Sequence, residues 1–224
     1  MHILLLTDIP FDTGSWVGRY MPLVSYLSRK GHKITILMPD HNPRTEGYHL
    51  ENTENVFIYE TGIPFFKKVY EGRKNYSTLI LIKIGLQNVI RAIRLAAPLN
   101  FDIIIVCKPL PIAAMAGLFF KITRGKKIIL DCDDAEVAIN SVQSSLQRNI
   151  IRIFENIFPR LVDKVLVNSQ YIFNRVRKFG ISENKITYIP NGVDVERFSK
   201  ISKDKPLNGN LVIDKIILYY GDLN

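Results

Sequence analysis

The sequence predicts an α/β fold in which helices cover both faces of a doubly wound parallel sheet. Short apolar runs rich in Ile, Leu and Val alternate with longer segments whose apolar residues recur at helical spacing. The apolar runs are nearly continuous, which is typical of strands buried on both faces of a parallel sheet. We therefore expect a Rossmann-like domain whose ligands bind at the carboxyl ends of its strands, near the switch in strand order.

The predicted strands are apolar runs that end at a polar residue or a proline. The first directly follows the start of the chain, and the second ends before Pro39. The expected strands are residues 3–7, 33–38, 55–59, 102–107, 127–130, 164–168 and 185–189. The loops that follow Thr7, Cys107 and Leu130 are consequently the places where we expect a site.

The predicted helices fill the intervals between these strands. Gly31 after the first helix is a stop signal, and Pro111 suits the first helical position, where an N–H is not needed. We expect one helix to end near Pro159, because proline cannot donate a helical hydrogen bond. The expected helices are residues 16–30, 77–97, 111–123, 145–158 and 171–179.

Composition narrows the class of protein. A hydrophobic content of 47% with 23% charged residues is close to the globular average and excludes a disordered chain. Two isolated cysteines, Cys107 and Cys132, exclude a disulfide scaffold and suit a reducing cytoplasm. No signal peptide and no apolar stretch long enough for a transmembrane helix is apparent. The net charge of +9 predicts an anionic partner, such as a nucleotide, a phosphate, a nucleic acid or an anionic lipid.

The chain divides into three predicted parts. Residues 1–198 form the Rossmann-like domain, and residues 199–214 are polar with Lys, Pro and Gly, as expected of a linker. Residues 215–224 begin with an apolar run that resembles the first strand of a second domain. We expect the remainder of that second domain to be missing from this chain, because a single strand cannot bury itself.

The first loop has two interpretations. Gly14 and Ser15 lie between the first strand and the first helix, where backbone N–H groups and the helix dipole favour a phosphate. The spacing of Gly14 and Gly18 matches neither a dinucleotide-binding nor a P-loop motif. The alternative is an ordinary turn in which Ser15 caps the helix.

An acidic cluster follows the fifth predicted strand. Residues 131–136 contain four carboxylates, among them Asp133 and Asp134. They could hold a metal, accept a proton or bind sugar hydroxyls, and the plain alternative is capping and solvation. Because the cluster lies in the expected crevice, we favour function. The four histidines are scattered and suit no metal site, so we expect neither a metal nor another cofactor.

Basic residues are concentrated between Thr61 and Asn100. Seven basic residues, including Lys67, Lys68, Arg73 and Lys74, accompany a single acidic one, with aromatic residues interleaved. This pattern suits an anionic membrane surface, and a solvated basic loop explains it equally well. No nucleic-acid-binding motif supports the remaining alternative.

The segment from Leu161 to Phe198 carries the most specific motifs. It reads "LVDKVLVNS" and, after a helix, "KITYIPNGVDVERF". These residues resemble the family 4 retaining glycosyltransferases of the GT-B fold. The opening strand, the Gly14 loop and "GHKIT" at residues 31–35 are similar to the same family.

The resemblance implies the N-terminal, acceptor-binding half of a two-domain enzyme. Such an enzyme transfers a sugar from a nucleotide-sugar to a glycan or a lipid-linked acceptor. Gly14 would approach the donor pyrophosphate, and Asn191 and Gly192 match the hinge motif. Asp133 stands where many members carry a histidine. We expect Asp133 and Asp134 to be the catalytic residues, with one of them beside the transferred sugar.

Because the donor domain is expected to be absent, we expect this chain alone to be inactive, either as a truncated enzyme or as half of a split enzyme completed by a separate donor-domain chain. The alternative is a non-catalytic subunit that docks on a membrane or a partner. A GT-B-like nucleotide-sugar epimerase is a third, weaker rival. We expect a cytoplasmic protein of polysaccharide biosynthesis that associates peripherally with the inner face of the plasma membrane.

Overall fold

A computed structural model describes residues 1–9, 14–39, 53–62, 78–139 and 145–192. These residues belong to one compact unit, Met1–Val193, and a second unit comprises Asp194–Asn224. The second unit lies outside the described residues. The predicted boundary at Phe198, the linker and the strand after it therefore remain predictions.

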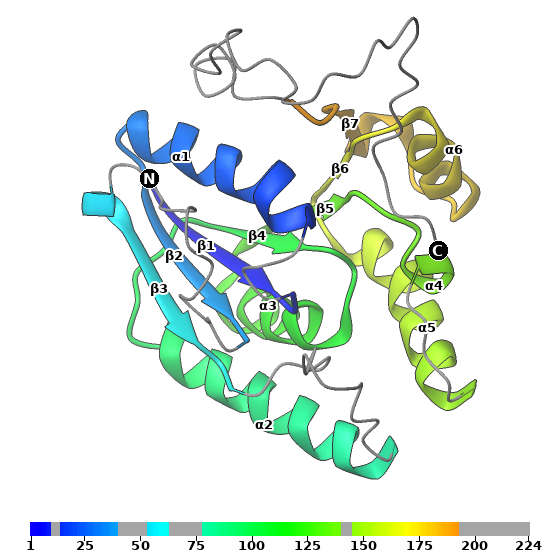
Figure 1. Ribbon diagram of the computed structural model, residues 1–224, viewed down its shortest axis with the longest axis horizontal. Coiled ribbons are helices and arrows are strands. Elements are labelled where there is room, and N and C mark those ends of the chain that lie inside the picture. The colour runs from blue at the N-terminus through cyan, green and yellow to red at the C-terminus, as the bar shows by residue number, and fades with distance from the viewer. Residues whose placement is uncertain (10–13, 40–52, 63–77, 140–144, 193–224) are drawn as a thin grey trace, which may run out of the picture. The chain divides into compact units, whose positions relative to one another are not determined.

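Seven parallel strands form one sheet, which confirms the predicted fold class (Figure 1). Their spatial order is β3-β2-β1-β4-β5-β6-β7, so the direction of winding reverses at β1. The strands are β1 (His2–Thr7), β2 (Lys33–Met38), β3 (Val56–Glu60), β4 (Ile103–Cys107), β5 (Lys127–Cys132), β6 (Lys164–Val167) and β7 (Ile186–Tyr188). All seven lie within two residues of the predicted runs at either end.

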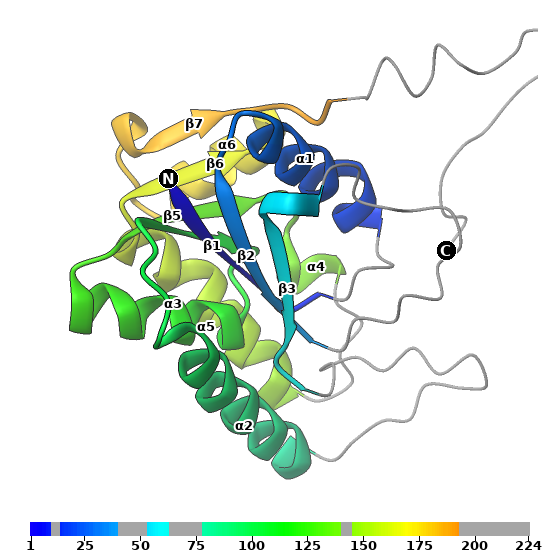
Figure 2. The same ribbon diagram turned by 90° about the vertical axis from the view of Figure 1, so that its left-hand side faces the viewer.

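Helices pack on both faces of the sheet (Figures 1 and 2). The first crossover, from β1 to β2, places η1 and α1 on one face, whereas the crossovers that run the other way place α2, α3, α5 and α6 on the opposite face. The helical elements are η1 (Trp16–Tyr20), α1 (Met21–Arg29), η2 (Thr53–Asn55), α2 (Thr78–Ala96), α3 (Pro111–Arg124), α4 (Glu136–Ile139), α5 (Ser145–Leu161), α6 (Gln170–Lys178) and η3 (Glu183–Lys185).

The central strands are buried on both sides, as their sequences predict. In β1, Leu4 and Leu6 join the core cluster under α2, α3 and α5, whereas Ile3 and Leu5 join the one under α1. The same alternation divides β4. Each strand therefore contributes to two cores at once, which explains why its sequence is continuously apolar.

Three local details differ from the predicted elements by a few residues or by helix type. Strand β5 continues through Asp131 and Cys132 instead of ending at Leu130, so the first acidic residue lies in the sheet. The first helix begins as a π-turn, in which the Met21 N–H donates to the carbonyl of Trp16. Helix α5 includes Pro159, since only two residues follow it and it packs, buried, beside Phe158.

Phe120 of α3 offers a test of the larger core. Its side chain is fully buried and stacks edge-on with Phe101 at a centroid separation of 5.2 Å. We expect Phe120→Ala to lower the free energy of unfolding by ~3–5 kcal/mol in urea titrations, because it removes apolar contacts and leaves a cavity. The neighbouring Phe119→Ala, at a side chain that is 40% exposed, is the matched control. Equal losses for both variants would contradict the assigned core.

Candidate functional site

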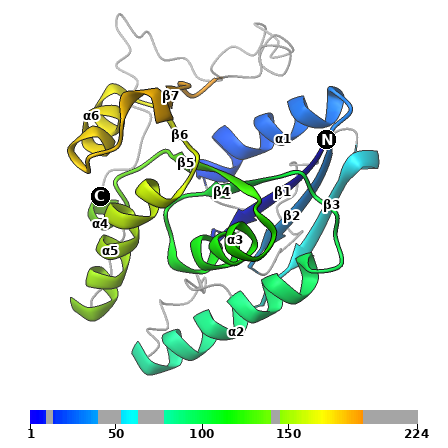
Figure 3. The ribbon, with the colours of Figure 1, turned by 180° about the vertical axis from the view of Figure 1, so that it is seen from behind.

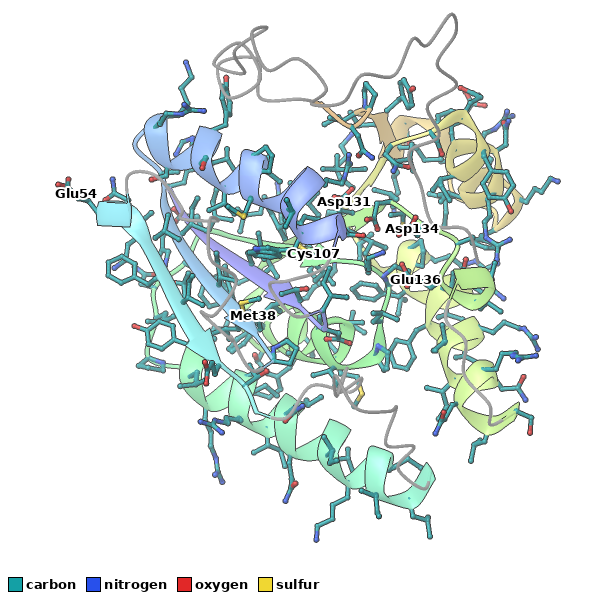
Figure 4. The ribbon with its side chains drawn as sticks, in the orientation of Figure 1. Met38, Glu54, Cys107, Asp131, Asp134 and Glu136 are labelled. Atoms are coloured by element: carbon teal, nitrogen blue, oxygen red, sulfur yellow. The ribbon has the colours of Figure 1, made fainter. Side chains whose placement is uncertain are left out.

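The candidate site lies where β1, β4 and β5 end side by side. These three strands are neighbours in the sheet, and the change in winding direction falls next to them. Figure 4 shows Asp131, near the end of β5, close to Asp134 and Glu136, which follow the strand. The strands that end at Thr7, Cys107 and Cys132 are therefore neighbours at one edge of the sheet, and the expectation that this edge holds a site stays a prediction.

Lys108 is the centre of the acidic cluster, although nothing in the sequence singled it out. Its Nζ lies 2.9 Å from Asp133 Oδ1, 2.6 Å from Asp134 Oδ2 and 3.0 Å from Glu136 Oε1. The residue is 3% exposed, and its φ of 72° is in the left-handed region, which a lysine rarely adopts. Such a conformation persists only where the surroundings enforce it, and here three carboxylates do so.

Charge and burial set the protonation of this cluster. Burial alone would lower the pKa of Lys108, but Glu136, Asp133 and Asp134 raise it, so the ammonium stays charged. Burial raises the pKa of Glu136 to about 7, and the nearby Asp133 and Asp134 add to this while Lys108 opposes it. With one ammonium among three carboxylates, the cluster remains negative overall once Glu136 has lost its proton.

Asp133 has an oxygen that is not hydrogen-bonded by the described residues. Its Oδ1 is in ionic contact with Lys108 Nζ, but it accepts no hydrogen bond within the described part of the chain, and it is fully shielded. Buried acceptors nearly always have a donor. The side chain of Asp134, by contrast, is 37% exposed and so remains accessible.

Asp8, directly after β1, caps α3 from across the sheet. Its two carboxylate oxygens accept the N–H groups of Ile112 at 2.9 Å and Ala113 at 2.7 Å. These bonds satisfy donors at the start of the helix, where no earlier turn can do so. Burial nevertheless raises the pKa of Asp8 to about 7, against the effect of both hydrogen bonds.

Arg19 connects three parts of the site that are distant in sequence. It binds Asp131 through two hydrogen bonds, Nε to Oδ2 at 2.6 Å and Nη2 to Oδ1 at 2.7 Å. Its Nη1 donates to the carbonyl of Ile189 at 3.1 Å and to Oδ1 of Asn191 at 2.9 Å. The helix after the first loop, the end of β5 and the start of the predicted hinge motif are therefore joined at one guanidinium.

The predicted phosphate-binding residues have mixed outcomes. Asn191 and Gly192 are exposed, and Asn191 is tied to Arg19. Ser15 has helical angles and makes no capping bond, so its interpretation as an N-cap was wrong. Gly14 is exposed, and no described atom lies within 4 Å of the position that a Cβ would take. A phosphate-binding role for Gly14, Ser15, Asn191 and Gly192 stays a prediction.

The acidic oxygens are spaced as a cation site would require, since those of Asp133, Asp134 and Glu136 all lie within 4.8 Å of one another. The ammonium of Lys108 already supplies a positive charge among them. Cys107 and Cys132 are buried, and burial raises the pKa of both thiols well above its usual range. Neither cysteine therefore provides a thiolate nucleophile.

The basic residues proposed to face a membrane, Lys67, Lys68, Arg73 and Lys74, lie outside the described residues. The second half of that basic stretch forms α2, which carries Lys83, Arg91 and Arg94. None of the described helices is both long and apolar enough to cross a bilayer.

Sequence reasoning missed Lys108, Asp8 and Arg19. Asp8 carried a usable signal, because it directly follows a buried strand at the edge of the sheet where this fold places its sites. Lys108 and Arg19 carried none, since each is identified only by partners that are 25 or more residues away.

Breaking the Arg19–Asp131 pair should destabilise the domain. The two side chains are 8% and 1% exposed, so Arg19→Met leaves a carboxylate buried without its partner. We expect a loss of ~3–5 kcal/mol in the free energy of unfolding. Arg177→Met is the control, because its pair with Glu183 is 50% and 61% exposed and should contribute less than ~1 kcal/mol. A small loss for Arg19→Met would contradict this assignment.

Stability should fall as the pH rises from about 4 to about 7. The folded-state pKa values of Asp8 and Glu136 are raised to about 7 from ordinary values of 3.8 and 4.5. The folded state therefore binds more protons than the unfolded state in this window, and rising pH removes that advantage. Urea unfolding at several pH values should show the fall, and Asp8→Asn should reduce it. Glu54→Gln, at an exposed position, should leave it unchanged. A rise in stability across this window would contradict the prediction.

Comparison with known proteins supports the fold. No curated protein matches the chain. Among solved structures, sucrose-phosphate synthase from Thermosynechococcus elongatus is similar, with a TM-score of 0.62 and 13% identity over 88% of this chain and 49% of that one. HepE of Anabaena, solved in complex with UDP-glucose, has a TM-score of 0.56 and 14% identity, and the match covers 88% of this chain and 45% of HepE. The UDP-GlcNAc 2-epimerase of Methanocaldococcus jannaschii has a TM-score of 0.51 and 12% identity, and the match covers 85% of this chain and 46% of the epimerase.

At these identities the structures show the fold alone, and this chain spans about half the length of each of the three. The sequence comparison is more specific. The model of the family described as Glycosyltransferase Family 4 matches residues 21–197. That range contains the acidic cluster, Lys108, and the motif at residues 189–192. The chain belongs to glycosyltransferase family 4.

Proposed function

We propose that this chain is the acceptor-binding half of a retaining glycosyltransferase that moves a sugar from a nucleotide-sugar to a glycan or a lipid-linked acceptor. The family match over residues 21–197 carries the proposal. The donor class is supported by HepE, which was solved with UDP-glucose and shares the fold. No metal and no other cofactor enters the proposal.

The charge of the site supports separate binding places for the sugar and for the phosphates of the donor. The Lys108 cluster is negative overall, so it repels phosphate but accepts hydrogen bonds from sugar hydroxyls. We assign this role to Asp133, which Lys108 holds at the carboxyl edge of the sheet, and to the more accessible Asp134. Lys108 fixes both carboxylates in place, which reduces the entropy lost when a sugar binds.

We assign the donor phosphates to the part of the carboxyl edge near Arg19, and not to the part near Lys108. Gly14 and Ser15 begin the helix that leads to Arg19, and a helix N-terminus favours an anion. Asn191 and Gly192 lie at the end of the described domain, next to Arg19. These assignments follow from the resemblance and from the position of the residues, and they require the pyrophosphate to approach from the Arg19 side.

The whole reaction needs groups beyond this domain. This chain spans about half the length of the similar structures, and a transferase must stabilise charge on the departing pyrophosphate. We propose that a donor domain, in the same chain or in a separate one, supplies those groups. The described domain alone is then expected not to transfer sugar from a nucleotide-sugar.

The test uses the chain joined to a family 4 donor domain. Asp133→Asn should lower kcat/KM for sugar transfer by ~100-fold, because it weakens hydroxyl contacts that position the sugar. Circular dichroism should show an unchanged fold. Glu183→Gln, at an exposed acid in η3, should keep the activity of the parent protein. If the joined enzyme consumes no nucleotide-sugar, or if Asp133→Asn transfers sugar at the parent rate, the proposal fails.

A second candidate is a non-catalytic subunit that docks on a membrane or a partner chain. One observation favours the membrane: α2, at the end of the basic stretch, carries three basic residues and no acidic one. Docking on a membrane is compatible with the transferase, since a lipid-linked acceptor would be presented at such a surface. We place the protein in the cytoplasm, at the inner face of the plasma membrane.

A further inference from the structure

We propose that the outward side of α2, α3 and α5 is the surface that docks on an anionic lipid bilayer. The inference develops the membrane candidate above, and it does not depend on nucleotide-sugar binding. It rests on three observations about the described residues: continuous apolar stripes, a groove between the helices, and charge of a single sign.

Each of the three helices exposes an apolar stripe at helical spacing. On α2 the stripe is Leu79, Leu86 and Ile90, with Ile80 and Ile82 beside it. On α3 it is Met115, Phe119 and Ile122, and on α5 it is Leu146, Ile153, Ile157 and Leu161. Leu79 and Ile122 are each 80% exposed. Spacings of three and four place each set on one side of its helix.

The stripes lie next to one another. Helix α3 packs between α2 and α5, and Figure 3 shows the three helices from behind, with α3 in the middle. A groove of about 660 Å³, including its open mouth, separates them. Its lining is almost wholly apolar and includes Ile82, Leu86, Met115 and Phe154. The stripes therefore merge into one surface instead of three separate ones.

This surface is unusual within the described domain. Nineteen large apolar side chains are exposed in the described residues, and twelve of them belong to these three helices. Helix α1, which covers the opposite face of the sheet, exposes only Tyr26 among its described residues. Scattered exposed apolar residues are ordinary, but a contiguous patch marks an interaction site.

Charge identifies the partner. The three helices contain eight basic residues and one acidic residue, Glu155, which is 3% exposed and paired with Arg175. Lys83 and Arg94 follow the α2 stripe, and Arg160 follows the α5 stripe. Apolar side chains with basic residues at their margin match the acyl region and anionic headgroups of a bilayer.

The experiment measures co-sedimentation of the purified 224-residue chain with vesicles. One set contains phosphatidylcholine alone, and the other is an equimolar mixture of phosphatidylcholine and phosphatidylglycerol. We expect binding to the anionic vesicles that weakens as salt is raised, and at least tenfold weaker binding to the neutral ones. Equal partitioning into both vesicle types, or no binding to either, would overturn the proposal.

Two pairs of variants locate the surface. Leu79→Glu with Ile122→Glu adds two carboxylates to the stripes at highly exposed positions, so folding should be preserved. Its control, Tyr26→Glu with Tyr171→Glu, adds the same charge at exposed residues of α1 and α6. Similarly, Lys83→Gln with Arg94→Gln removes two charges from the α2 side, and Arg29→Gln with Lys30→Gln removes two from the end of α1 and the residue after it.

We expect each variant pair on the surface to weaken binding to anionic vesicles by about tenfold or more, and each control to change it by less than threefold. Equal effects of surface and control variants would show a general charge effect and overturn the assignment. Failure of sugar transfer in the joined enzyme, with this vesicle binding intact, would reject the transferase and leave the docking surface in place.

Discussion

One ammonium group among three carboxylates governs the carboxyl edge of this sheet. Lys108 binds Asp133, Asp134 and Glu136 at distances of 3.0 Å or less, and its charge opposes the burial that raises the pKa of Glu136. The lysine accepts a left-handed backbone to do so. The loop after β4 and the loop after β5 consequently hold each other in place, and the hydroxyl-binding role assigned to Asp133 depends on this fixed arrangement.

Arg19 performs a comparable task one strand away. It donates two hydrogen bonds to Asp131, and its third nitrogen donates to Ile189 and Asn191. Arg19 thus links the beginning and the end of the described domain. The two cations divide the acidic residues between them, Asp131 to Arg19 and the others to Lys108. The site is therefore built from residues of four separate chain segments, although its candidate acids are contiguous in sequence.

The fold was largely predictable from the sequence, because the apolar runs that become β1, β2 and β4 have no other way to bury both faces. The acidic cluster was also predictable, since its position after β5 follows from the topology. Lys108 and Arg19 were not, because a long basic side chain reaches its partner through tertiary structure and leaves no local pattern. Pro159 shows a second limit: proline marks a lost hydrogen bond, but the surrounding packing decides whether the helix stops or continues through it.

The π-turn at Trp16–Tyr20 has a practical consequence. Trp16 is the only tryptophan in the chain, and it is fully buried within this turn, three residues before Arg19. Its indole therefore reports on the turn that carries Arg19, the residue bound to Asp131 of β5. Emission excited selectively from this one tryptophan registers rearrangement of that turn when a small molecule is titrated in, without any label being attached.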